Sequence, residues 1–344
     1  MPDTMPAAVY VGDGRLVVEE RPVPVPGPGQ ALVEVAQCGI CGSDMHLVLE
    51  GYARPGTVLG HEWAGTVAGV GPGVQGWEPG ARVVCNPTAG CGACRPCRLG
   101  RPSVCLTRAA PDYLSFGGAF TRFVVVQAAQ LLRLPESLTT RAAALTEPTA
   151  IALHTAGLAA VVPSDRVLVT GAGPVGLLMV AVLRARGVTD ITVSEPSPRR
   201  RDRAAAVGAA AVVAPDAFPR PDLGRPVAAP FDVAFECSGR AEAAETALDQ
   251  LDFAGTLVFV GTGHQQPRIN HNRMIVLELS VIGAFNYDDD GFVSAVDLLA
   301  SRWLPVDLLI EPADVFLGDI GSTMQRLAAG ELAGKVLVRP EAHS

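Results

Sequence analysis

The alternation of two residue patterns after about residue 150 constrains the fold of this chain more than any other feature. Short apolar segments rich in valine are each followed by a longer segment with a helical, often alanine-rich pattern. We expect strands at 166–170, 190–194, 211–213, 231–235 and 256–260, and helices at 174–186, 200–207 and 241–251. Repeated strand–helix units form a doubly wound parallel sheet, so this part is predicted to be α/β.

The first half of the chain has a different pattern. Short β-like runs at 31–35, 64–70, 82–84 and 123–126 are separated by Gly and Pro, which is typical of a compact, irregular β domain. A chain of 344 residues is long for one core, which also favours two domains. The tail is expected to add helices near 292–300 and 320–329 and a last strand at 335–338.

A glycine-rich turn stands between the first predicted strand of the α/β part and its helix. It reads Gly171-Ala-Gly173-Pro174-Val175-Gly176. In such a turn the first glycine permits a tight bend, the second lets the backbone approach a pyrophosphate, and the third lets the helix pack on the strand. The free N–H groups at the helix start favour an anion, so we expect these residues to bind a dinucleotide.

An acid closes the second predicted strand of the α/β part. Glu195 follows Gly176 by nineteen residues, where a carboxylate binds the adenosine ribose hydroxyls and repels a 2′-phosphate. This favours NAD over NADP. The basic cluster that follows, Arg199 to Arg203, is interpreted either as a solvated helix start or as a contact to the cofactor through Arg200, and it keeps NADP open as the less favoured cofactor.

Four of the eight cysteines crowd into fifteen residues. Cys91, Cys94, Cys97 and Cys105 have the spacing C-x2-C-x2-C-x7-C. Four thiolates close a tetrahedral zinc shell with no open position, so the lobe 91–105 is predicted to hold a structural zinc. An iron–sulfur cluster is the alternative.

Three further patches carry residue types that bind a catalytic metal. Cys41 to His46 supplies a thiolate, a hydroxyl and an imidazole; Gly60-His61-Glu62 supplies an imidazole and a carboxylate; Thr146-Glu147-Pro148 supplies a second carboxylate. Each patch alone is a weak signal. Together, in this order and ahead of a dinucleotide fold, they are specific.

With these motifs the chain resembles the zinc-containing medium-chain dehydrogenases/reductases (the alcohol dehydrogenase superfamily), and it is most similar to the sorbitol (polyol) and threonine dehydrogenase branch. The resemblance covers essentially the whole chain. It implies a GroES-like, β-rich catalytic domain formed by residues 1–150 and 288–344, and a Rossmann dinucleotide-binding domain at 151–287.

The resemblance also implies roles for individual residues. Cys41 and His61 match the first two ligands of a catalytic zinc, and Glu62 matches an acid that binds the metal directly in this branch. Glu147 matches the third ligand position, so whether Glu62, Glu147 or a water completes the shell stays open. Two zinc ions per subunit are therefore expected, one catalytic and one structural. Asp44 resembles the acid that orients the ligand histidine.

Two more residues match the family's proton path. A zinc with three protein ligands keeps one position open for the substrate alcohol and lowers the pKa of that alcohol. Ser43 is expected to accept the alcohol proton, and His46 resembles the histidine that passes it to solvent. Lys335 lies in a Gly-Lys pair that the family shares, and no role is assigned to it.

Composition excludes several classes of partner. The net charge of −8 leaves no basic face for nucleic acid. The most membrane-like segment, 142–164, contains Glu147, Pro148, His154 and Pro163, so no membrane span is expected. The first six residues lack a secretory signal, which predicts a cytoplasmic protein. An edge strand near 275–285 is expected to join subunits into a homodimer or homotetramer.

The predicted function is hydride transfer between NAD(H) and a secondary alcohol or ketone, such as a polyol, an amino alcohol or a cyclic alcohol. Three alternatives stay open. One is an enoyl or quinone reductase of the same superfamily, another is an NADP-dependent ketone reductase, and the third is a catalytically silent zinc protein that senses a nucleotide. The set Cys41, His61 and Glu62 disfavours the first, because those reductases lack the zinc ligands.

Overall fold

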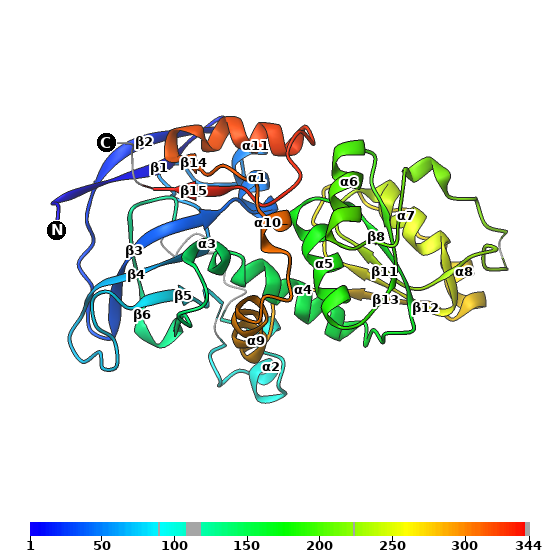
Figure 1. Cartoon of the computed structure of the whole chain (residues 1–344), viewed down its shortest axis with the longest axis horizontal. Coiled ribbons are helices and arrows are strands. Elements are labelled where there is room, and N and C mark those ends of the chain that lie inside the picture. Colours follow the sequence, from blue (N-terminus) through cyan, green and yellow to red (C-terminus); the bar gives the residue numbers. More distant parts are fainter. Residues whose placement is uncertain (89, 108–117, 223, 341–344) are drawn as a thin grey trace.

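A computed structural model describes residues 1–88, 90–107, 118–222 and 224–340. The molecule has two parts side by side: a β-rich part at the left of Figure 1 and an α/β part at the right. The last strand, β15 (Leu337–Arg339), returns to the β-rich part, so both ends of the chain contribute to it.

The α/β part is built on a six-stranded sheet whose neighbouring strands are all parallel. Its strand order is β10-β9-β8-β11-β12-β13. The strands are β8 (Arg166–Thr170), β9 (Asp190–Ser194), β10 (Ala211–Val213), β11 (Phe231–Glu236), β12 (Leu251–Phe259) and β13 (Ser280–Gly283). The helices are α5 (Pro174–Ala185), α6 (Pro198–Val207), α7 (Ala241–Asp249) and α8 (His271–Leu277). The order reverses between β8 and β11, where a doubly wound sheet opens the crevice that binds ligands.

The β-rich part contains a seven-stranded sheet and a separate hairpin. The sheet order is β14-β15-β3-β4-β5-β7, with β6 paired to β3 off this path. Besides β15, its strands are β3 (Gln30–Gly39), β4 (Glu62–Val70), β5 (Arg82–Cys85), β6 (Phe123–Gln127), β7 (Leu131–Arg133) and β14 (Val315–Phe316). The hairpin consists of β1 (Thr4–Gly12) and β2 (Arg15–Pro22).

Helices join the two parts. α4 (Thr146–Leu158) runs without a break through the expected domain boundary at 150/151. Ala150, Ala152 and Ala156 of α4 belong to a hydrophobic cluster that also includes Val84 of β5 and Leu178 of α5, so one apolar core continues from one part to the other. The remaining helices are α1 (Gly42–Leu49), α2 (Arg95–Arg98), α3 (Thr140–Ala143), α9 (Asp289–Ala300), α10 (Val306–Leu309) and α11 (Ile320–Ala328), and short 3₁₀ turns lie at 102–104, 128–130, 215–217 and 317–319.

The predicted fold class, a GroES-like β-rich domain with a doubly wound parallel sheet, is confirmed. The strands expected at 166–170, 190–194 and 211–213 have these bounds in the structure, whereas β12 begins five residues earlier than expected. The hairpin β1–β2 and helix α8 were not predicted, because their apolar residues follow no clear period. Among the described helices, none is both long enough and apolar enough to cross a bilayer.

Candidate functional site

A buried aspartate holds together the two segments that carry the first predicted metal ligands. Cys41 immediately precedes α1, and its N–H donates to Oδ2 of Asp44 over 3.1 Å. The other carboxylate oxygen of Asp44 accepts the N–H of Gly60 at 3.3 Å and lies 3.6 Å from Nδ1 of His61. Asp44 therefore fixes both Cys41 and His61, in agreement with the orienting role expected for it.

Glu62, at the start of β4, forms a buried ion pair with Lys335. The Nζ atom of Lys335 lies 2.7 Å from Oε1 and 2.6 Å from Oε2 of Glu62, and it donates to the Ile40 carbonyl at 3.0 Å. Both side chains are 2% exposed or less. Burial lowers the pKa of Lys335, but Glu62 outweighs it and raises that pKa above its usual value. Gly39 leaves room for the carboxylate, because a Cβ at that position would overlap with Oε2 of Glu62.

Ligand atoms of Cys41, His61 and Glu62 lie within 4.8 Å of one another. Burial lowers the pKa of His61, but the charges of Asp44 and Cys41 outweigh burial and raise it well above its usual value. The same negative potential favours a divalent cation. A thiolate, an imidazole and a carboxylate are donors that zinc accepts, so these residues fit the predicted catalytic zinc.

Glu147 stands apart from this group of three. It lies buried in the first turn of α4 and is not among the atoms that converge within 4.8 Å. Burial raises the pKa of Glu147 to about 7, with His61 opposing the rise and Glu62 adding to it. The carboxyl group is thus within electrostatic reach of the other ligands but is not gathered with them.

The four clustered cysteines converge around one point. Their Sγ atoms are 4.0 Å apart for Cys91 and Cys97, 3.4 Å for Cys94 and Cys97, and 3.8 Å for Cys94 and Cys105. Four sulfurs held about 2.3 Å from a tetrahedral zinc are about 3.8 Å from each other, so the spacing fits the predicted structural zinc. Burial opposes ionisation of Cys105, but hydrogen bonds from Thr107 and from the Cys91 N–H lower its pKa to about 5, which favours the thiolate that zinc binds.

The glycine-rich turn lies between β8 and α5, at the point where the strand order reverses. Gly171 has a φ of +91°, and a Cβ on Gly176 would overlap with the Gly171 carbonyl oxygen. Gly173, by contrast, directly precedes α5, and a Cβ added to it would meet no atom within 4 Å, so there is open space at the helix N-terminus. Pro174 and Val175 form the first turn of α5, whose free N–H groups suit a pyrophosphate.

Glu195 lies directly after β9 and is 4% exposed. Its Oε2 accepts the Ala172 N–H at 2.8 Å and its Oε1 accepts the Ser197 N–H at 2.9 Å. The carboxylate therefore joins the glycine-rich turn to the turn after β9. Each oxygen retains a second lone pair, with which a carboxylate accepts ribose hydroxyls.

The contacts of Arg200 disagree with its predicted place in the cofactor site. Its guanidinium donates to the carbonyls of Leu327 and Leu332, over 2.8–3.1 Å, and so holds α6 against the C-terminal segment. Arg203 does the same through an ion pair with the buried Glu311. The arginine at the cofactor turn is Arg201, which donates to the Glu195 carbonyl at 2.7 Å. The basic cluster 199–203, expected to face solvent or the cofactor, therefore mainly holds α6 against the C-terminal segment.

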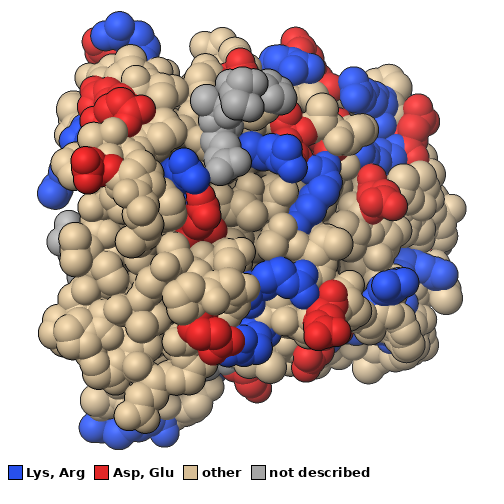
Figure 2. All heavy atoms as spheres, turned by 60° about the vertical axis from the view of Figure 1, so that its left-hand side comes forward, with Lys and Arg blue, Asp and Glu red and all other residues tan. Residues whose placement is uncertain are grey.

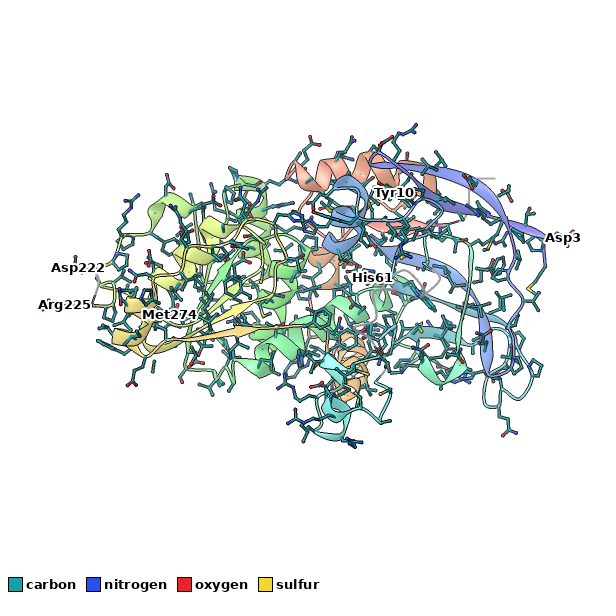
Figure 3. The ribbon with its side chains drawn as sticks, turned by 180° about the vertical axis from the view of Figure 1, so that it is seen from behind. Asp3, Tyr10, His61, Asp222, Arg225 and Met274 are labelled. Atoms are coloured by element: carbon teal, nitrogen blue, oxygen red, sulfur yellow. The ribbon has the colours of Figure 1, made fainter. Side chains whose placement is uncertain are left out.

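Ser43 and His46, predicted for proton transfer, lie on α1. Ser43 is exposed and precedes the buried Asp44. His46 is partly exposed, and its Nε2 lies 3.2 Å from the carbonyl oxygen of Thr262, beyond the end of β12. Figure 3 shows His61 where the β-rich part meets the α/β part, so the predicted zinc ligands and His46 lie along the junction of the two parts.

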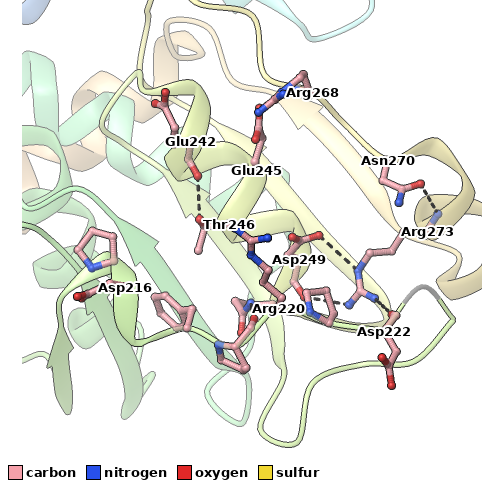
Figure 4. Close-up of a pocket in the computed structure, with 15 residues that line it drawn as sticks. Asp216, Arg220, Asp222, Glu242, Glu245, Thr246, Asp249, Arg268, Asn270 and Arg273 are labelled. Atoms are coloured by element: carbon pink, nitrogen blue, oxygen red, sulfur yellow. Dashed lines mark hydrogen bonds and ion pairs between the residues drawn. The ribbon is translucent and has the colours of Figure 1, made fainter.

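One cavity outside the predicted site is lined by none of the predicted site residues. This cavity of about 670 Å³ lies at the outer end of the α/β part, lined by α7, the segment 215–222 and Arg273 (Figure 4). Arg273 is fully buried and donates to the carbonyls of Asp222, Arg225 and Asp249, so its charge supports the backbone there. On the face drawn in Figure 2, basic and acidic side chains are interspersed and form no continuous basic surface.

Known proteins match the chain over nearly its whole length. The family model for the alcohol dehydrogenase GroES-like domain matches residues 27–136, and the model for zinc-binding dehydrogenase matches residues 174–301. Human sorbitol dehydrogenase (Homo sapiens) is 32% identical over 324 residues, which cover 90% of this chain and 88% of that protein. The L-threonine 3-dehydrogenase of Pyrococcus abyssi is 36% identical over 279 residues, or 77% of this chain and 78% of that one.

The chain belongs to the zinc-containing medium-chain dehydrogenase/reductase family. It is an oxidoreductase of the zinc-binding dehydrogenase type, as predicted. The family's architecture also matches in three dimensions: a protein of Sinorhizobium meliloti 1021 described as a zinc-binding dehydrogenase, with NADP bound, superposes with a TM-score of 0.87 at 31% identity, over 98% of this chain and 100% of that one.

Sequence reasoning missed the roles of two residues that contact Glu62 in the structure. Lys335 was given no role although it is the only lysine among 27 basic residues, and a single lysine in an arginine-rich chain is a signal of special placement. Gly39 gave no signal, because nothing in a strand sequence indicates which side chain will approach its backbone. Tyr113 and Phe116, two aromatic residues that could line a substrate pocket, lie outside the described residues.

Proposed function

We propose that this protein is a zinc-dependent, NAD-linked dehydrogenase that interconverts a secondary alcohol and its ketone. The observation that carries the proposal is the convergence of Cys41, His61 and Glu62 within 4.8 Å, supported from behind by Asp44 and Lys335. Names of relatives such as sorbitol and L-threonine 3-dehydrogenase point to alcohols of this class. A polyol, an amino alcohol or a cyclic alcohol is the substrate we favour.

NAD is the cofactor we propose, bound at Gly171, Gly173, Pro174, Val175 and Gly176. The buried carboxylate of Glu195 supports this choice, because its charge attracts ribose hydroxyls and repels a 2′-phosphate. NADP remains the second choice. Arg201, at the same turn, is the positive group that supports it.

The chain's own residues position the substrate and move its proton. A bound zinc would make an alcohol oxygen more acidic, and a bound nicotinamide would serve as the hydride acceptor. Cys41, His61 and Glu62 are the proposed zinc ligands, and we propose Glu147, whose charge interacts with those of His61 and Glu62, as the acid that takes the place of Glu62 during turnover. Ser43 accepts the alcohol proton in this scheme, and the partly exposed His46 on the same helix passes it to solvent.

We assign residues 1–150 and 288–344 to the catalytic domain and 151–287 to the cofactor domain, with the first junction inside α4. Strand β13 lies at the end of its sheet, and the nearby Ile275, Val276 and Phe285 are exposed, which suits pairing of two subunits there. A cytoplasmic location suits eight cysteines that form no disulfide.

Turnover and metal content together test the proposed function. The zinc-loaded protein is incubated with NAD and a panel of secondary alcohols and polyols, and NADH formation is followed by absorbance. We expect turnover with at least one member, two zinc ions per chain, and a Cys41→Ala variant that is folded but inactive. One zinc per chain, held by the cysteine lobe alone, together with no turnover on the panel would overturn the proposal.

A further inference from the structure

Outside the two zinc sites, two histidines and a glutamate converge where the β-rich and α/β parts meet. His46 lies on α1, Glu50 directly follows α1, and His264 lies beyond the end of β12. The Nδ1 atom of His46 is 2.7 Å from Oε1 of Glu50, and Nε2 of His264 contacts the other oxygen, Oε2. One carboxylate thus faces one imidazole nitrogen from each part of the molecule.

The outward ring nitrogen of each histidine has an oxygen partner of its own. Nε2 of His46 lies 3.2 Å from the Thr262 carbonyl, which can only accept, so this nitrogen carries the hydrogen. Nδ1 of His264 lies 3.5 Å from the hydroxyl of Tyr52. Metal-binding histidines commonly have an oxygen partner on the far nitrogen. The Thr262 carbonyl fixes the tautomer of His46 in this way, and the Tyr52 hydroxyl is the corresponding partner of His264.

In this arrangement a ring nitrogen of each histidine faces one oxygen of the Glu50 carboxylate. With hydrogen on Nε2, Nδ1 of His46 is the ring nitrogen that faces a carboxylate oxygen of Glu50. The carboxylate of Glu50 therefore has one imidazole nitrogen on either side, and a proton on such a nitrogen or a metal ion between these atoms holds them together.

We propose that His46, Glu50 and His264 form a third metal site, which binds a divalent transition metal such as zinc across the junction of the two parts. Two imidazoles and one carboxylate are a common zinc set, and they leave one position open. Their ligand atoms lie within 4.8 Å of one another. Zinc binds such atoms at about 2.1 Å, so small side-chain rotations complete the shell.

Exposure separates this site from the other two. The side chains of His46 and Glu50 are 33% exposed and that of His264 is 54% exposed, so the ion exchanges with solvent and binds more weakly than the ions in the buried sites. A metal there also occupies His46. Because His46 transfers the proton in the proposed function, a metal bound there should also reduce turnover. That expected loss depends on the proposed function, whereas metal binding at the site does not depend on it.

Calorimetric titration with zinc chloride tests the site. The protein is first brought to two zinc ions per chain and is then titrated in a buffer free of chelators. We expect one further equivalent to bind. Glu50→Gln and His264→Gln should each weaken this step by about 10- to 100-fold or more, since losing even an outer partner of a ligand costs that much. His271→Gln, which changes an exposed histidine at the start of α8, is the matched control and should bind like the parent.

The outcomes separate this inference from the proposed function. If the parent takes up no third equivalent, or if both variants bind it as the parent does, the third site is refuted. A circular dichroism spectrum and a zinc content of two per chain verify that each variant is folded. If the third zinc binds and both variants lose it while no alcohol is oxidised, the metal site stands and the proposed function fails.

Discussion

Replacing Lys335 by methionine should destabilise the protein strongly, because it leaves the charge of Glu62 buried without its partner. At 2.6 Å and an effective dielectric constant of 20, the pair attracts by about 6 kcal/mol. Much of this attraction only offsets desolvation, and removing one partner of a buried pair typically costs about 3–5 kcal/mol. We expect a loss of about 3 kcal/mol for Lys335→Met in the zinc-loaded protein, where the metal takes up part of the unpaired charge.

Urea denaturation followed by circular dichroism measures this loss. The double variant Lys335→Met/Glu62→Gln removes the unpaired charge as well. Because Glu62 is also a proposed zinc ligand, the single and double variants are compared after removal of the catalytic zinc, where the double variant should recover at least half of the stability that the single variant loses. Arg326→Met is the matched control, because it breaks an exposed pair with Glu331 and should change the free energy of unfolding by less than about 1 kcal/mol. Equal losses in the single and double variants would show that packing, and not the unpaired charge, explains the effect.

Three further predictions concern the metal and cofactor sites. Cys94→Ala should lose one zinc per chain by elemental analysis and unfold at a lower temperature; a variant as stable as the parent would contradict a structural role for the cysteine lobe. Asp44→Asn should weaken catalytic zinc binding by about 10- to 100-fold in competition with a chelator, since Asp44 orients both Cys41 and His61. Unchanged affinity would mean that Asp44 only caps α1. Glu195→Ala should lower the ratio of kcat/KM for NAD to that for NADP by at least about tenfold, the effect of losing one charged contact of about 1.4 kcal/mol. An unchanged ratio would refute its role in cofactor choice.

The sequence predicted well those features that depend on local spacing. Strands β8 and β9, the glycine-rich turn and the four-cysteine lobe are each set by a short run of residues whose pattern has a direct physical meaning. Predictions that required knowledge of distant partners were less successful. Lys335 and Glu62 are separated by 273 residues, and no local pattern indicates that their charges meet.

For the basic cluster on α6, too, the sequence did not reveal the distant partners. The sequence indicates four nearby positive charges but not the acceptors available to them in space. In the structure, Arg200 and Arg203 bind carbonyls and a carboxylate that lie more than 100 residues further along the chain. Glu147 is the opposite case, since its motif placed it with the other ligands, whereas helix α4 keeps it buried but outside the converging group.

The single lysine has a consequence for chemical modification of this protein. The side chain of Lys335 is 2% exposed, so the folded chain offers no lysine to an acylating reagent or to an amine-reactive cross-linker. Lysine acylation at Lys335 therefore requires that the segment between Ile40 and Glu62 open first. The rate at which mass spectrometry detects this one modified peptide therefore measures how often the metal centre opens. The measurement needs no substrate, and no other lysine contributes to it.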